Sequence, residues 1–260
     1  MNVAVIGSLG IVGRAVEALF RPHCEVVTYD RAGAAEYPID DIALCQFAVV
    51  CVGTPPGPDG ACDVNDVMEA VGQLPLDRVL LKSTVPPGTT DALIARTGKE
   101  VCFWPEYVGE NAYPTPYWPS GMDGVPFVVL GGKPATRCMF IDHLMPILGP
   151  SKTYFQCTAV EAEVIKYMEN AYFATKVTFV NEFRRICDAF GADWHSVREG
   201  WLLDPRVNPD HTAVFADDPG FGGRCLPKDV NAIVAAATAA GYVPEFLRDV
   251  LRNNDRFRTP

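Results

Sequence analysis

The sequence predicts an α/β protein: an N-terminal Rossmann-like, doubly wound parallel sheet, followed by an all-α domain built on one long helix. In the N-terminal part, short β-branched runs alternate with amphipathic segments and with loops of glycine, proline and polar residues, as in open parallel sheets. From residue 158 an apolar helical period continues until Gly191, and such a helix is long for a globular domain. We place the domain boundary close to residues 151–157, which gives domains 1–155 and 156–260.

The first strand–loop–helix–strand unit has the pattern of a dinucleotide-binding motif. A strand at 2–6 is followed by the loop Gly7-Ser8-Leu9-Gly10-Ile11-Val12-Gly13 and a helix, and a second strand at 25–29 ends at Asp30. Such a unit sets a pyrophosphate on the helix N-terminus, and the acid accepts hydrogen bonds from ribose hydroxyls. The acid favours NAD over NADP, although the adjacent Arg31 keeps the alternative open, as does a plain βαβ turn.

Further strands and helices continue the alternation. The strands are predicted at 47–52, 79–81, 101–104 and 127–130, and the helices near 64–71 and 90–96. Loops at the carboxyl ends of the strands share the edge at which open α/β sheets bind ligands. Four polar residues of these loops are therefore expected to line one crevice: Thr54, Thr84, Glu106 and Glu110. Each of them alone fits a helix cap or a solvated loop residue equally well.

The long helix is predicted over 158–190. Thr158 and Glu161 form a capping box at its start. The helix is apolar over much of its circumference, so we expect it to pack on several partners, including a second subunit. Lys166 and Asn170 lie on one face of it, either as a functional pair or as surface residues.

The stretch from Gly220 to Asp229 is the strongest candidate for a chemical site. Three glycines precede Cys225, and Pro227 suits the first turn of a helix, so the cysteine falls at a helix N-terminus that favours a thiolate. Asp229 shares a helical face with the cysteine, and Lys228 adds positive charge. The stretch predicts either a nucleophilic site or a small buried cysteine beside an ordinary first-turn acid.

Composition restricts the class of protein. The 260 residues are 48% hydrophobic and 21% charged, with a formal net charge of −10, which argues against nucleic acid or an anionic membrane as the main partner. Nine cysteines without a C-x-x-C pair fit neither a disulfide framework nor a structural zinc site. With no basic leader and no apolar run of membrane length, we expect a cytoplasmic protein without a metal.

Taken in order, these motifs resemble the nucleotide-sugar 6-dehydrogenases, the family of UDP-glucose and GDP-mannose dehydrogenases. The similar stretches cover nearly the whole chain, and the last is the most specific: Val52-Gly53-Thr54-Pro55, Lys82-Ser83-Thr84-Val85-Pro86, Pro105-Glu106-Tyr107-Val108-Gly109-Glu110, Glu163 to Ala171, Asp204-Pro205-Arg206 and Gly220 to Asp229.

The resemblance implies a four-electron, NAD-dependent oxidation of a primary alcohol at sugar C6 to a carboxylate. Cys225 would form a thiohemiacetal and then a thioester, and Lys166 with Asn170 would stabilise oxyanions. Asp229 would transfer protons through a water, and Glu106, helped by Thr84, would act as general base in hydrolysis. These roles match the need for a soft nucleophile, a preplaced cation and a basic carboxylate.

The resemblance also assigns binding residues and a partner. The residues expected to face NAD are Gly7, Leu9, Gly10, Ile11, Val12, Asp30, Arg31, Val52, Gly53, Thr54, Thr84, Glu110 and Lys228. The residues expected to face the sugar or nucleotide-sugar substrate are Glu106, Tyr107, Val108, Glu110, Lys166, Asn170, Arg206, Phe221, Gly222 and Cys225. Arg206 would reach the substrate from the neighbouring subunit of a homodimer formed through the long helix.

Two features depart from the family pattern. The glycine loop either adds a residue to G-x-G-x-x-G or places Ser8 where the first glycine belongs. The chain also ends soon after the Cys225 stretch, so we expect a compact dehydrogenase with a smaller or differently held substrate, or a separate polypeptide that supplies the missing part. Two other functions remain open: a single-step alcohol or hydroxy-acid dehydrogenase, and a truncated, non-catalytic NAD-binding relic.

Overall fold

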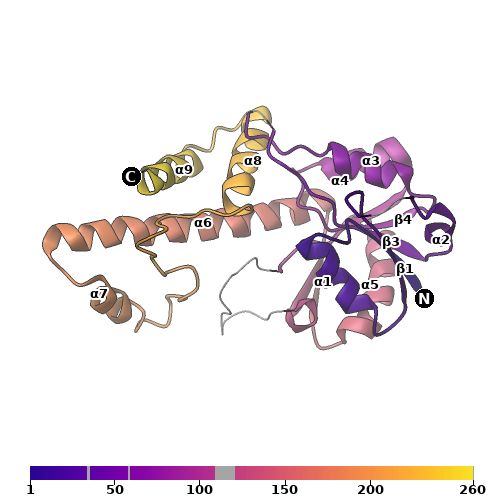
Figure 1. Cartoon of the computed structure of the whole chain (residues 1–260), viewed down its shortest axis with the longest axis horizontal. Coiled ribbons are helices and arrows are strands. Elements are labelled where there is room, and N and C mark those ends of the chain that lie inside the picture. Colours follow the sequence, from indigo (N-terminus) through magenta and orange to yellow (C-terminus); the bar gives the residue numbers. More distant parts are fainter. Residues whose placement is uncertain (34–35, 58, 109–120, 260) are drawn as a thin grey trace. The chain divides into compact units, whose positions relative to one another are not determined.

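The computed structural model describes residues 1–33, 36–57, 59–108 and 121–259 (Figure 1). The chain divides into two compact units. The first contains Met1–Pro55 and Cys62–Lys166, and the second contains Pro56–Ala61 and Tyr167–Pro260. Glu110 lies outside the described residues.

A seven-stranded sheet forms the first unit, in the order β2-β1-β3-β4-β5-β6-β7. The strands are β1 (Asn2–Ile6), β2 (Glu25–Tyr29), β3 (Phe47–Val50), β4 (Arg78–Leu81), β5 (Glu100–Phe103), β6 (Phe127–Gly131) and β7 (Thr153–Cys157). Neighbouring strands are parallel, except that β5 and β6 pair antiparallel at Phe103 and Gly131. The predicted doubly wound α/β fold is confirmed, as a mostly parallel sheet.

Helices cover both faces of this sheet, because its central strands are apolar on both sides. The helices of the unit are α1 (Ile11–Phe20), α2 (Ile39–Ala43), α3 (Asn65–Gln73), α4 (Thr89–Thr97) and α5 (Pro134–Leu148), with a 3-10 turn at Met122–Gly124. Along β1, Ala4 and Ile6 pack into a core cluster with α3 and α4, whereas Val3 and Val5 pack with α1 and α5. Figure 1 shows these two pairs of helices on opposite sides of the sheet.

The second unit is helical. It contains most of α6 (Ala159–Phe190), together with α7 (Trp194–Trp201), α8 (Leu226–Ala239) and α9 (Glu245–Arg258). Its core joins α6, α8 and α9 through Ala174, Val230 and Val250. The 32-residue α6 confirms the long helix, and the capping box exists, since Glu161 accepts hydrogen bonds from the amide and hydroxyl of Thr158.

Candidate cofactor and catalytic sites

A pocket of about 380 Å³ lies in the first unit at the switch point of the sheet. The chain leaves β1 toward β2 and then returns to β3 on the other side of β1, and ligands of such sheets bind where the strand order reverses. The pocket lining includes six of the residues predicted to bind the cofactor and two acids of α3: Gly7, Gly10, Asp30, Arg31, Val52, Gly53, Asp66 and Glu69.

The glycine loop has the geometry of a phosphate-binding turn. Gly7 adopts a left-handed φ of 85°, and a Cβ on Gly13 would come within 2.1 Å of the Gly7 carbonyl oxygen, so α1 packs directly on the turn. A Cβ on Gly10 would meet nothing closer than 3.5 Å. Counting back from Gly13, the spacing therefore places Ser8 at the position of the first family glycine, while Gly7 makes the left-handed turn.

Gly10 precedes the first residue of α1, whose first-turn amides lack partners within the helix. These amides and the helix dipole suit a pyrophosphate, so the loop fits the predicted dinucleotide. Of the other loop residues, Leu9 and Ile11 are exposed, and Val12 packs against the core cluster beneath α1.

Asp30 follows the last residue of β2 and holds the glycine loop. Its Oδ2 accepts a hydrogen bond of 3.0 Å from the Leu9 amide, and its Oδ1 accepts one of 2.9 Å from the Ala32 amide. Each carboxylate oxygen has a second lone pair, so Asp30 can also accept from ribose hydroxyls as predicted.

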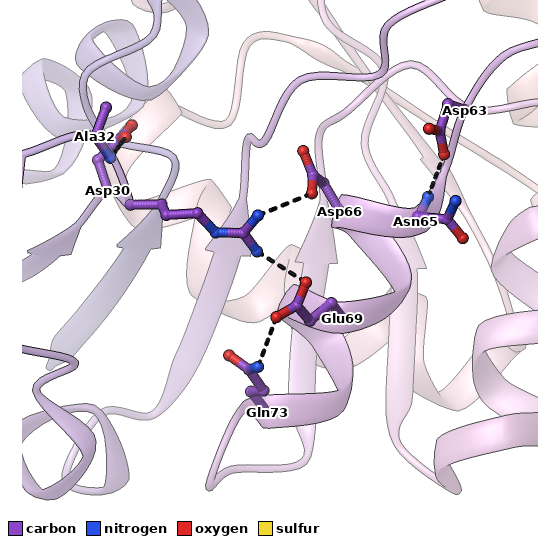
Figure 2. A network of polar contacts seen from close by, with 8 residues as sticks. Asp30, Ala32, Asp63, Asn65, Asp66, Glu69 and Gln73 are labelled. Carbon is purple, nitrogen blue, oxygen red and sulfur yellow. Dashed lines mark hydrogen bonds and ion pairs between the residues drawn. The ribbon is translucent and has the colours of Figure 1, made fainter. Parts of the chain in front are cut away.

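Arg31 forms ion pairs with two acids of α3, the Asp66 and Glu69 side chains labelled in Figure 2. Its Nη1 lies 3.1 Å from Oδ1 of Asp66, and its Nη2 lies 2.8 Å from Oε2 of Glu69. Gln73 donates to the other oxygen of Glu69 at 2.9 Å. The two acids were not predicted, because the sequence shows them only as polar residues of an exposed helix face.

The carboxyl ends of β3 and β4 are tied together by two hydroxyl groups. Ser83 Oγ donates to the Val52 carbonyl at 2.6 Å, and Thr54 Oγ1 donates to the Thr84 carbonyl at 2.9 Å. Thr54 and Thr84 are therefore neighbours at the sheet edge, as the predicted crevice requires.

Lys82 is a buried lysine at the end of β4, with only 2% of its surface exposed. Its Nζ donates to the Pro105 carbonyl at 2.8 Å and lies 4.0 Å from the centre of the Trp104 ring. Burial lowers the pKa of Lys82 to about 8, against the opposing effect of the nearby Glu106 carboxylate. Sequence reasoning did not select Lys82, although a lysine directly after a buried strand is a usable signal.

The residues after Trp104 include three predicted positions, and a fourth, Lys166, contacts one of them. Glu106 Oε2 accepts a hydrogen bond of 3.1 Å from the Val108 amide. Lys166, in the part of α6 that belongs to the first unit, places Nζ 5.1 Å from the centre of the Tyr107 ring. Lys166 is buried, so the interpretation of Lys166 as a solvated surface residue does not hold.

Glu163 is a further buried carboxylate that the sequence did not reveal as important. It accepts hydrogen bonds from the Gly88 amide at 2.6 Å and from the amide and hydroxyl of Thr90 at 2.8 and 2.7 Å. Glu163 thus caps α4 from α6 and fixes the loop that follows β4. Burial raises the pKa of Glu163 to about 6, although these hydrogen bonds lower it.

In the second unit, Cys225 occupies the N-cap position directly before α8, and Pro227 lies in the first turn, as predicted. Cys225 is exposed, which excludes the alternative of a small buried cysteine. One turn further along, Asp229 is only 2% exposed. Its Oδ1 lies 2.5 Å from Lys228 Nζ, and its Oδ2 accepts a hydrogen bond of 2.5 Å from Asn170 Nδ2.

Two asparagines hold the glycine-rich loop before Cys225. Asn254 of α9 accepts from the Phe221 amide at 2.6 Å and donates to the Phe221 carbonyl at 2.9 Å. Asn181 of α6 accepts from the Gly220 amide at 3.0 Å. Gly220 has a φ of 77°, and a Cβ there would come within 2.5 Å of the Asn254 side chain. Asn254 was missed, although a polar residue on the buried face of a helix signals such a contact.

Three predicted substrate residues have other surroundings in this unit. Phe221 is buried and packs in the core of α6, α8 and α9, and its backbone amide and carbonyl both bond Asn254. Gly222 lies against the Arg258 guanidinium, 2.8 Å from where a Cβ would be. Arg206 is exposed and pairs with Asp204 through its Nη2 at 2.5 Å.

Comparisons with known proteins relate the chain to nucleotide-sugar dehydrogenases. The sequence model described as "UDP-glucose/GDP-mannose dehydrogenase family, central domain" matches residues 160–256. UDP-glucose 6-dehydrogenase from Pseudomonas aeruginosa is 30% identical, with 92% of this chain and 56% of the relative aligned. UDP-glucose 6-dehydrogenase TuaD from Bacillus subtilis is 30% identical, with 84% and 48% aligned.

Solved structures extend the likeness over the whole chain. A UDP-glucose dehydrogenase from Pyrobaculum islandicum gives a TM-score of 0.83 at 27% identity, covering 98% of this chain and 68% of that one. A UDP-D-ManNAc dehydrogenase from Pyrococcus horikoshii shares the fold, with a TM-score of 0.78 at 24% identity and coverage of 99% and 69%.

The fold and the two sites define a Rossmann-like protein with a helical unit that presents a cysteine at a helix N-terminus. The chain is a shorter relative of the UDP-glucose/GDP-mannose dehydrogenase family, whose central-domain model matches its helical part. It spans about half the length of the curated relatives that it matches. Within the described residues, no helix is long and apolar enough to cross a bilayer.

Proposed function

We propose that the chain carries out the NAD-dependent oxidation of a nucleotide-sugar C6 alcohol to a carboxylate, through a thioester on Cys225. One observation carries this proposal: an exposed Cys225 begins α8, one turn before an Asp229 that is buried and held by Asn170 and Lys228. The helix N-terminus favours the thiolate, and Asp229 supplies a fixed proton acceptor. The names of the relatives, UDP-glucose 6-dehydrogenases, suggest the substrate.

The pocket of the first unit is the proposed NAD site. The amides after Gly10 would bind the pyrophosphate, and Asp30 would accept from the adenosine ribose. The strand ends at Val52, Gly53 and Thr54 would border the cofactor, with Thr84 beside Thr54. NAD, when bound, accepts a hydride from the substrate in each oxidation; this chain's residues supply the binding, the proton acceptors and the nucleophile.

In the first oxidation the alcohol loses a hydride and a proton and becomes an aldehyde. Asp229 is the proposed proton acceptor, through an ordered water. The Cys225 thiolate then bonds to the aldehyde carbon, and Lys166 and Asn170 stabilise the oxyanion of the thiohemiacetal. Loss of a second hydride from this oxyanion gives the thioester.

Water completes the reaction by breaking the thioester. Glu106 is the proposed general base that takes a proton from the water, and Thr84 assists. The balance is one alcohol, two NAD⁺ and one water converted into one carboxylic acid, two NADH and two protons. Cys225 leaves as the thiolate and is ready for another cycle.

We further propose a homodimer formed through α6, which supports the assignment of 156–260 as the dimerisation and catalytic domain and 1–155 as the NAD-binding domain. Large apolar side chains are exposed along α6 at helical spacing: Met168, Tyr172, Phe179, Phe183 and Phe190. An apolar helix face of this length is expected to be covered. Nine cysteines without a C-x-x-C pair suit a reducing compartment, so we place the protein in the cytoplasm.

The test is the number of NADH formed per molecule of acid. UDP-glucose is the first substrate to try, followed by UDP-N-acetylmannosamine and GDP-mannose, with the full chain and with Cys225→Ser. Two NADH per acid, and loss of acid formation in Cys225→Ser, support the proposal. One NADH per substrate with an unaffected variant supports a single-step dehydrogenase instead, and NAD binding without oxidation of any of these substrates supports a non-catalytic NAD-binding relic.

A further inference from the structure

We propose that Arg31, held by Asp66 and Glu69, is a specificity-determining residue that restricts the pocket at the sheet switch point to NAD and excludes NADP. The inference rests on the proposed function in one respect, namely that this pocket holds the adenosine end of a dinucleotide. The sequence left the choice between the two cofactors open at Arg31. The contacts of Arg31 favour NAD over NADP.

In Rossmann-like sites that use NADP, an arginine beside the end of the second strand binds the 2′-phosphate. Arg31 has that position in the sequence, next to Asp30, and it lines the pocket. Its guanidinium is nevertheless committed to α3, with Nη1 bound to Asp66 and Nη2 bound to Glu69. Figure 2 shows the carboxylates of Asp66 and Glu69 and the neighbouring amide of Gln73 on α3.

The charges that line the pocket also favour NAD over NADP. Three carboxylates line it, those of Asp30, Asp66 and Glu69, against the single guanidinium of Arg31. A 2′-phosphate would bring roughly two further negative charges into this lining at neutral pH. Ribose hydroxyls carry no charge, and Asp30 keeps lone pairs to accept from them.

Gln73 orients the Glu69 carboxylate toward Arg31. By donating to Oε1 of Glu69, it leaves Oε2 directed at Arg31. The side chains of Arg31, Asp66 and Glu69 are each at least half exposed, and exposed ion pairs contribute little to folding stability. The acids can therefore be replaced without unfolding the chain, which makes the inference testable.

The experiment measures dissociation constants of NADH and NADPH by calorimetry, independently of turnover. The proteins are the wild-type chain, the double variant Asp66→Asn/Glu69→Gln, and the same double variant with Arg31→Ala. Asp77→Asn, an exposed acid paired with Lys99 and absent from the pocket lining, is the matched control.

The wild type is expected to bind NADH at least about a hundredfold more tightly than NADPH. The double variant should bind NADPH at least about tenfold more tightly than the wild type does, because a freed guanidinium gains a phosphate partner, with NADH affinity changed less than about threefold. Adding Arg31→Ala should remove the gain, and the control should match the wild type.

If the double variant still binds NADH and its NADPH affinity is unchanged, the inference about Arg31 fails while the proposed NAD site stands. A gain that persists without Arg31 also overturns the inference, because the acids would then act without the arginine. If no protein binds NADH, the proposed cofactor site fails, and the inference fails with it.

Discussion

Asn170 on α6 and Asp229 on α8 meet through a hydrogen bond of 2.5 Å between Nδ2 and Oδ2. The two residues are 59 positions apart in the sequence, and both are buried. Because Lys228 occupies the other oxygen of Asp229, the carboxylate is held from both sides. We interpret these two contacts as the interactions that fix Asp229, the proposed proton acceptor, one turn from Cys225.

Replacing Asn170 should therefore destabilise the second unit. We expect Asn170→Ala to lower the free energy of unfolding by about 1–3 kcal/mol, because a buried carboxylate oxygen loses its donor. Urea titration of Asn170→Ala, Asp229→Ala and the double variant gives the coupling energy, expected to be about 1 kcal/mol or more. Purely additive losses would show that the contact contributes nothing.

Asn254 should matter far more than its neighbour in α9. Asn254→Ala removes both side-chain bonds to the backbone of Phe221, and Asn254 is only 4% exposed. We expect a loss of roughly 2–5 kcal/mol and faster hydrogen exchange at the Phe221 amide. Asn253→Ala is the matched control, since Asn253 bonds within its own helix, donating to the Asp249 carbonyl and accepting from Arg256. Equal effects at the two positions would contradict the role of Asn254.

Two glycines at the start of α1 should have different roles: Gly13 is needed for folding and Gly10 for cofactor binding. Gly13→Ala should unfold or strongly destabilise the chain, because its Cβ would overlap the Gly7 carbonyl oxygen. Gly10→Ala should fold normally, with 3.5 Å of clearance, but bind NADH at least about tenfold more weakly, since a methyl group would face the pyrophosphate. Gly72→Ala in α3 meets no atom within 4 Å and should gain about 0.5–1 kcal/mol. Undiminished NADH affinity in Gly10→Ala would refute the proposed phosphate contact.

Lys82 should make stability depend on pH in the alkaline range. Its pKa falls from 10.5 in the unfolded chain to about 8 in the folded one, so between these values the unfolded chain holds more protons. The free energy of unfolding should therefore rise with pH across that window, by roughly 3 kcal/mol at most.

The raised thiol pKa values of Cys51 and Cys102 act in the opposite direction, so the informative quantity is the difference between wild type and Lys82→Met. That difference should change between pH 8 and pH 10.5, whereas Lys133→Met, at an exposed position, should track the wild type. Parallel curves for wild type and Lys82→Met would show that Lys82 titrates normally.

Local patterns predicted much of the fold and of each site. The glycine loop, the capping box at Thr158 and the placement of Cys225 all follow from residues within one turn or loop of each other. Besides the 3-10 turn at Met122–Gly124, three elements were missed: α2, which has only five residues, α5 and β7. Pro146 lies inside α5, and β7 is short and largely exposed, so neither shows a clear period. The predicted domain boundary fell on β7.

The contacts that hold the sites could not be predicted, because they join residues far apart in the sequence. Arg31 reaches Asp66, Glu163 reaches Gly88, and Asn254 reaches Phe221. Each polar side chain looks like an ordinary surface residue until folding places a backbone amide or an opposite charge beside it. The residue types at the sites were therefore predictable, but their partners were not.

The most direct measurement of the central claim is intact-mass spectrometry of Glu106→Gln incubated with NAD and UDP-glucose. Without the proposed base for hydrolysis, the thioester should accumulate, and the protein should gain the mass of the substrate less four hydrogens, on Cys225. The same variant with Cys225→Ser should gain no mass. Formation of two NADH per substrate by the Cys225→Ser protein at the wild-type rate would contradict the cysteine mechanism.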